Sequence, residues 1–96
     1  MNYRTTRQAD QDIIDIYMRG AADFGVAQAE QYHAGMVAVF DVLADNPHIA
    51  RERAEFDPPV RLHRYQAHMI AYAVHGEGIL IIRVLHGRQE WERCLS

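Results

Sequence analysis

Apolar residues in the first quarter of the chain recur at intervals of three and four, which is the period of an α-helix. After Ala9 this apolar stripe consists of Ile13, Ile16, Tyr17, Gly20 and Phe24. The other side is polar and carries Gln8, Asp12, Asp15, Arg19 and Asp23. Thr6 is a suitable N-cap, because its hydroxyl can accept a hydrogen bond from a free amide of the first turn. We therefore predict an amphipathic helix that follows a brief strand at residues 3–5.

The helical period returns after Gly25 and continues to the residues before Pro47. Its apolar positions are Ala29, Tyr32, Met36, Val39, Phe40 and Leu43. Pro47 ends this helix, because proline has no amide hydrogen and disfavours helical angles at the preceding Asn46. The short break at Gly25 predicts an antiparallel helical hairpin. We interpret the apolar stripe as core that packs against a sheet.

The second half of the chain has the shorter apolar runs that are typical of β-strands. Residues 47–59 form a polar connection dense in charges of both signs, which we expect to be a solvated face or a short helical turn, with the lining of a groove as the alternative. Alternation begins at Val60, and apolar runs follow at residues 69–74 and 79–85 with a Gly-containing turn between them. Two adjacent hairpins predict a three-stranded antiparallel meander.

Helices on one face of such a sheet make an α+β fold, which we expect to form a single domain over residues 1–96 with a short C-terminal tail. The only cysteine, Cys94, cannot form an internal disulfide, and the N-terminus lacks the basic and apolar regions of a signal peptide. We therefore expect a cytoplasmic protein. No apolar segment approaches the roughly 20 residues of a membrane span.

The charge balance limits the classes of partner. All ten basic residues are arginine, against thirteen acidic residues, and the formal net charge is -3. This balance disfavours broad, sequence-independent binding to nucleic acid, although it leaves a local basic patch open. The arginine bias has two explanations, a codon preference or a need for forked contacts to carboxylate or phosphate.

Two ionisable residues stand out in the last apolar run. Arg83 interrupts the run, so its charge must be paired or must reach solvent. We expect an ion pair with a carboxylate, such as one from the first helix, rather than a contact with phosphate. We interpret His86 as a cap of the strand end, although histidine also suits proton transfer near neutral pH. The spacing of the histidines and Cys94 is not typical of a metal site, and we expect neither a metal nor a cofactor.

Several short motifs follow one another along nearly the whole chain. They are an acidic opening of the first helix at residues 9–17, Phe24-Gly25, Ala29 with Tyr32, Leu43-Ala44-Asp45-Asn46-Pro47, Arg61, His68-Met69-Ile70-Ala71-Tyr72 and Arg83-Val84-Leu85-His86. In this order they resemble the ParE branch of the RelE/ParE toxins, which belong to bacterial type II toxin–antitoxin pairs. The chain departs from that pattern at residues 48–50, where the family often has a glycine.

The resemblance implies a toxin that inhibits DNA gyrase by binding and has no catalytic residues of its own. It also implies a ParD-like antitoxin, a dimer with a ribbon-helix-helix DNA-binding part and a C-terminal segment that folds onto the toxin. Such a segment would lay an apolar stripe into a groove and pair its charges at the rim.

Two other functions stay open. RelE-like members cleave mRNA on the ribosome, and here the corresponding groups would be Arg64, Arg83 and His86, with His63 as a further acid or base. The acidic balance and the absence of lysine depart from that branch. The other alternative is a non-toxic homologue that only binds ParD-like antitoxins.

Candidates for contact with the antitoxin or the target are Ile14 and Val37 on the helical hairpin and Trp91, Arg93 and Leu95 in the tail. Ile14 lies off the main stripe, so it either widens the buried face or contacts a partner. Trp91 either pins the tail to the core or anchors a partner. We expect Trp91→Ala to weaken toxicity or antitoxin binding.

Overall fold

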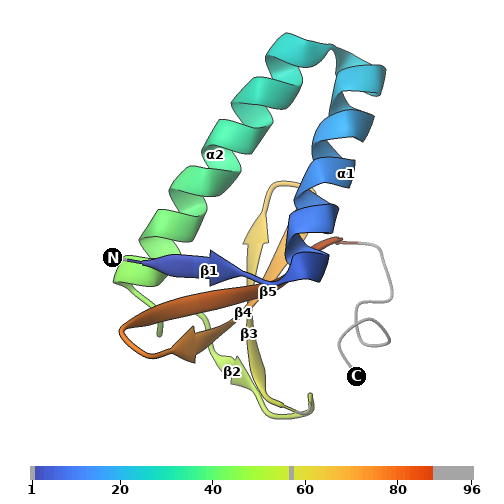
Figure 1. The fold of residues 1–96 in the computed structure, drawn as a ribbon. Helices are drawn as coiled ribbons and strands as arrows, with labels where there is room; N and C mark the ends of the chain where they lie inside the picture. Colours follow the sequence, from blue (N-terminus) through green and yellow to red (C-terminus); the bar gives the residue numbers. More distant parts are fainter. Residues whose placement is uncertain (1, 57, 88–96) are drawn as a thin grey trace.

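The computed structural model describes residues 2–56 and 58–87. Its elements in chain order are β1 (Tyr3–Thr5), α1 (Arg7–Phe24), α2 (Val26–Asp45), β2 (Glu52–Arg53), β3 (Val60–Tyr65), β4 (His68–His75) and β5 (Gly78–His86). The two helices form a hairpin that covers one face of the sheet and extends well beyond it (Figure 1). The predicted α+β fold, with an N-terminal strand, a helical hairpin and a meander, is confirmed.

The sheet has two strands more than the meander alone. Its order is β1-β5-β4-β3-β2, with β3, β4 and β5 antiparallel to one another. The strand β1 pairs with β5 in parallel, with Tyr3 opposite Ile79, so β5 lies inside the sheet. The expectation that residues 47–59 form only a solvated face or a helical turn was wrong, because β2 pairs there with β3. An ion pair of 2.6 Å joins Arg53 and Glu55 after this strand.

The core lies between α2 and the central strands. Met36, Phe40 and Leu43 of α2 are buried, and Tyr32 and Val39 pack against the same core, so the predicted stripe of α2 is confirmed. Complete burial of each large apolar side chain stabilises the fold by about 1.5–3 kcal/mol. The sheet supplies the other wall of the core with Ile70, Tyr72, Ile79, Ile81 and Val84.

A bulge in β5 explains the uneven spacing of those core residues. Tyr72 pairs with Ile81 and Ala71 pairs with Arg83, so Ile82 is an extra residue in β5. An extra residue shifts the alternation of a strand by one position. Ile79 and Ile81 are therefore followed on the core side by Val84, three residues further on.

Two assignments in α1 were wrong. Phe24, predicted on the buried stripe, is 69% exposed, because it lies where the hairpin extends past the sheet and nothing in the described chain covers it. Asp12, predicted on the polar side, has a side chain only 14% exposed, because it turns toward β5. The predicted cap is confirmed, since the Thr6 hydroxyl accepts a hydrogen bond of 3.0 Å from the amide of Ala9.

Candidate functional site

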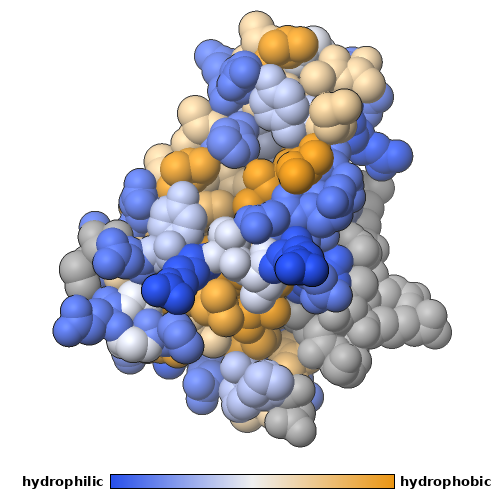
Figure 2. All heavy atoms as spheres, in the orientation of Figure 1, coloured by the Kyte–Doolittle hydropathy of each residue, from blue (hydrophilic) through white to orange (hydrophobic). Residues whose placement is uncertain are grey.

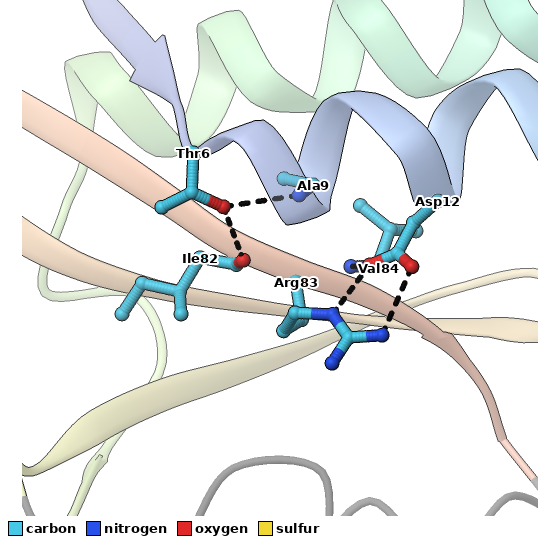
Figure 3. Close-up of polar contacts among 6 residues, drawn as sticks. All are labelled: Thr6, Ala9, Asp12, Ile82, Arg83 and Val84. Atoms are coloured by element: carbon cyan, nitrogen blue, oxygen red, sulfur yellow. Dashed lines mark hydrogen bonds and ion pairs between the residues drawn. The ribbon is translucent and has the colours of Figure 1, made fainter.

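The start of α1 is fastened to β5 by side chains that bond to the strand near its bulge (Figure 3). The Thr6 hydroxyl donates a hydrogen bond of 2.7 Å to the carbonyl oxygen of Ile82. One turn further along, the Asp12 carboxylate accepts bonds from Arg83 Nε at 2.8 Å and Arg83 Nη2 at 3.0 Å. Asp12 also accepts a bond of 3.0 Å from the amide of Val84. These contacts fix the position of α1 on the sheet.

The ion pair predicted for Arg83 is therefore confirmed, with a carboxylate of the first helix as its partner. The two side chains are 17% and 14% exposed, so solvent screens their attraction only weakly. Parallel bonds from a guanidinium to one carboxylate are among the stronger polar contacts in proteins. The pair neutralises the charge that interrupts the last apolar run.

A groove of about 890 Å³ lies between the two helices and the adjoining ends of β4 and β5. Apolar side chains in its lining come from all three walls and include Ile13, Ile16, Phe24, Met36 and Val84. Figure 2 shows apolar side chains at the surface along the hairpin and up to its end, bordered by hydrophilic ones. The groove thus offers an apolar surface with polar edges.

Charges along the groove differ from one end to the other. Along α1 its lining carries Asp15, Arg19 and Asp23, all of them exposed side chains. At the sheet end the lining carries His68 and His86, next to the Asp12–Arg83 pair. The α1 wall therefore has an excess of one negative charge, whereas two histidines lie at the sheet end.

The Tyr32 hydroxyl connects α2 to the sheet end of the groove. Its oxygen lies 2.7 Å from His68 Nδ1 and accepts a bond of 3.3 Å from the amide of Ala67. The imidazole of His68 lies edge-on to that of His86, with 5.5 Å between the ring centroids. Burial lowers the pKa of His68 below its ordinary value of 6.5, and the nearby His86 lowers it further. His68 is thus mainly neutral at pH 7 and accepts the Tyr32 proton at Nδ1.

The ring of Tyr65 supports this arrangement from β3. Its centroid lies 5.0 Å from that of Tyr32, and its hydroxyl donates a bond of 2.9 Å to the carbonyl oxygen of Tyr32. Burial raises the pKa of both phenols, so each keeps its proton at neutral pH.

A second hollow of about 330 Å³ adjoins the groove and is lined by Arg64, Ala67, His86 and Gly87.

The residues proposed for an mRNA endonuclease are only partly brought together. Arg64 and His86 line the second hollow. Arg83 lines the groove, where it is bonded to Asp12. His63 lies on β3 and lines neither cavity.

The candidates for contact with a partner lie in different environments. Ile14 is 53% exposed but lies outside the groove lining. Val37 is half-buried and also lies outside the groove lining. The tail candidates Trp91, Arg93 and Leu95 lie outside the described residues. The resemblance implied a groove, but sequence reasoning did not find its lining, because it treated Tyr32 only as core and gave His68 no role beyond its motif.

Residues 2–56 and 58–87 contain neither a metal-binding cluster nor a membrane-spanning helix. No group of three histidine, cysteine, aspartate or glutamate side chains has the arrangement that a metal ion needs. No helix in this part of the chain combines the length and the hydropathy of a membrane span.

A helical hairpin on a bulged five-stranded sheet, with a groove between them, is the architecture that the resemblance to ParE-like toxins predicts. The sequence model of the ParE toxin of the type II toxin–antitoxin system parDE matches residues 3–91. The chain belongs to this family, and it is a ParE-type toxin of a type II toxin–antitoxin system.

Individual relatives agree with this assignment. Toxin ParE1 of Mycobacterium tuberculosis is 40% identical over 73 residues, which are 75% of this chain and 74% of the relative. Toxin ParE1 of Caulobacter vibrioides is 31% identical over 84 residues, or 88% of this chain and 86% of the relative. A chain of the solved chromosomal ParDE TA system from P. aeruginosa has the same fold, with a TM-score of 0.71 and 24% identity over 90% of this chain and 95% of that one.

Proposed function

We propose that this toxin inhibits DNA gyrase by binding and that a ParD-like antitoxin neutralises it by placing a segment in the groove. The observation that supports the second part is the groove of about 890 Å³, which is apolar inside and charged at its edge. An amphipathic segment fits such a surface, because its apolar side meets the walls while its polar side stays in water. The solved relative is itself described as a ParDE system.

The first part rests on the family and on what Arg83 does in the fold. Bonds to Asp12 occupy two nitrogens of the Arg83 guanidinium. An arginine held in this way is a structural residue rather than a phosphate clamp. A net charge of -3 also does not favour an RNA-binding surface. We therefore propose action by binding, without catalytic residues and in the cytoplasm.

Pulse labelling of DNA and protein synthesis after induction of this chain alone tests the target. We expect DNA synthesis to fall first, together with a DNA-damage response, and purified gyrase to lose supercoiling activity when the chain is added. The matched control is induction of Asp12→Ala, which we expect to be inactive through loss of the fold. Normal DNA synthesis in cells that accumulate folded toxin would refute gyrase as the target.

Co-expression tests the antitoxin. The probe is the protein encoded by the reading frame next to the gene for this chain. We expect it to restore growth and to co-purify with the chain. Growth arrest that continues in the presence of that protein would contradict neutralisation by it.

One observation favours mRNA cleavage as the second candidate, namely that Arg64 and His86 line one hollow. This alternative predicts that protein synthesis falls first. It further predicts that His86→Ala abolishes cleavage on ribosomes while antitoxin affinity is retained. The absence of cleavage with ribosomes present would exclude it.

A further inference from the structure

The sheet end of the groove is a basic corner, which we define as Arg64, His68 and His86. His68 and His86 are paired across β4 and β5. Arg64 lies on β3, one position before the partner of His68, and lines the second hollow together with His86. Arg64 is exposed and has no ion-pair partner among residues 2–56 and 58–87. Arg83, which lines the groove close to this corner, is paired with Asp12. The positive charge of the Arg64 guanidinium makes this corner attractive to an anion.

The corner and the groove are one continuous surface. His86 and Ala67 line both the groove and the hollow that contains Arg64. A segment that follows the groove toward the sheet therefore reaches Arg64. Along α1 the same segment passes Asp15, Arg19 and Asp23, whose summed charge of one negative unit disfavours an acidic residue there. Charge complementarity thus places the acidic residue of a partner at the sheet end.

We propose that the antitoxin segment in the groove presents a carboxylate to the basic corner, and that the complex holds one more proton, at His68, than the separate proteins. This inference rests on the proposed neutralisation by an antitoxin. A carboxylate near His68 stabilises the imidazolium form, because opposite charges attract strongly where solvent is limited. The proton taken up comes from solvent.

The His68 ring can take up this proton without losing a hydrogen bond. In the neutral ring Nδ1 accepts from the Tyr32 hydroxyl at 2.7 Å. When Nδ1 is protonated it donates to the Tyr32 oxygen, and the hydroxyl hydrogen turns to the Tyr65 carbonyl oxygen, 3.4 Å away. A hydroxyl provides one donor and two acceptor sites, so the Ala67 amide keeps its bond. Tyr32 therefore bonds to either form of the ring.

Few ionisable groups face His68 from the elements around it. They are Tyr32 on α2, Tyr65 on β3 and His86 on β5. Among residues 2–56 and 58–87 none of these groups is a carboxylate, and the nearby Asp12 is bonded to Arg83. In the free toxin the groups around His68 do not stabilise its charged form, whereas a bound carboxylate does. Proton uptake is then a property of the complex.

Calorimetry on the full-length toxin and the adjacent-frame protein tests this inference. In two buffers of different ionisation enthalpy, we expect uptake of about one proton near neutral pH and an affinity that falls by up to about tenfold per pH unit as pH rises. His68→Asn keeps an acceptor for Tyr32 but cannot titrate, and we expect it to abolish the proton uptake. NMR titration should show the pKa of His68 raised in the complex.

Arg64→Gln tests the carboxylate contact. We expect it to weaken binding about tenfold or more, whereas Arg51→Gln, on an exposed loop arginine outside the groove, should leave affinity unchanged. Phe24→Ala, at the other end of the groove, reports whether the segment lies there at all. Binding that depends on Phe24 but not on Arg64 or pH would overturn the inference and leave the proposed function standing.

Two further outcomes separate the explanations. If the adjacent-frame protein does not bind the wild-type toxin, neutralisation in the groove fails and the inference fails with it. If Arg64→Gln abolishes inhibition of protein synthesis while antitoxin affinity is unchanged, the corner serves RNA chemistry and the inference is wrong.

Discussion

Asp12 and Arg83 lie 71 positions apart in the chain and are joined by two parallel hydrogen bonds of 2.8 and 3.0 Å. The carboxylate also binds the amide of Val84, so it holds both the side chain and the backbone of β5. One residue of α1 thus sets the position of the helix on the sheet, and the helix forms one wall of the groove.

Asp12→Asn should lower the free energy of unfolding by about 2–3 kcal/mol, because it leaves the largely buried Arg83 guanidinium without its counter-charge. Urea denaturation measures this loss. The control is Asp15→Asn on the same helix, since Asp15 is exposed and accepts only a bond of 2.9 Å from Gln11. We expect that change to stay within about 0.5 kcal/mol. Equal losses for the two variants would contradict a special role for Asp12.

Gly35→Ala should destabilise the protein by about 1–2 kcal/mol, although alanine normally favours a helix interior. A Cβ at Gly35 would overlap the Tyr65 hydroxyl, which bonds to the Tyr32 carbonyl oxygen. Thermal and urea unfolding measure the change. Gly20→Ala is the matched control, because its Cβ would meet only Ala29 at an ordinary distance of 3.7 Å.

The control should gain about 0.5–1 kcal/mol. The double variant Gly35→Ala with Tyr65→Phe should recover part of the loss, because the overlapping hydroxyl is removed. A Gly35→Ala variant that is as stable as Gly20→Ala would show that Tyr65 is not held where it lies.

Folding stability should decrease when the pH falls below about 6.5, in part because of His68. Burial and His86 lower the pKa of His68 in the folded state, so folding favours the neutral ring. The contribution of His68 is fully present above its unfolded pKa and is lost as the pH falls through the lower folded value. Urea unfolding of the wild type and of His68→Asn, from about pH 5 to about pH 8, measures it. A constant stability difference between the two over that range would be evidence against this contribution.

Local patterns predicted much of the fold. The stripe of α2 and the Thr6 cap depend on the spacing of neighbouring residues, and both are confirmed. The parallel pairing of β1 with β5 was not predicted, because it depends on where distant segments meet. Phe24 falls on the period of the buried stripe. It is exposed because the sheet does not reach beneath that end of the hairpin, which no local pattern indicates.

The candidate site was less predictable than the fold. A charge inside an apolar run requires a partner, so the ion pair of Arg83 could be expected, yet the sequence did not single out Asp12. Tyr32 and His68 are 36 positions apart, and nothing local indicates that their side chains meet. The roles of Ile14, Val37, Trp91, Arg93 and Leu95 in partner contact stay predictions.

Phe24→Ala should weaken binding of the adjacent-frame antitoxin by about tenfold to a hundredfold, since exposed aromatic side chains in an apolar groove are frequent binding hot spots. Calorimetry measures the affinity. Met18→Ala is the matched control, because Met18 is 64% exposed on the same helix and lies outside the groove, whereas Phe24 is 69% exposed and lines it. Neither truncation should change folding stability by more than about 0.5 kcal/mol.

The comparison of these two variants locates the antitoxin on the helical hairpin. Both side chains are apolar and similarly exposed, so a general loss of apolar surface would weaken binding equally in both. A loss restricted to Phe24→Ala places the segment inside the groove, next to the wall that continues to the basic corner. A loss restricted to Met18→Ala would instead place the partner on the outer side of α1, where Ile14 is also exposed, and would refute occupation of the groove.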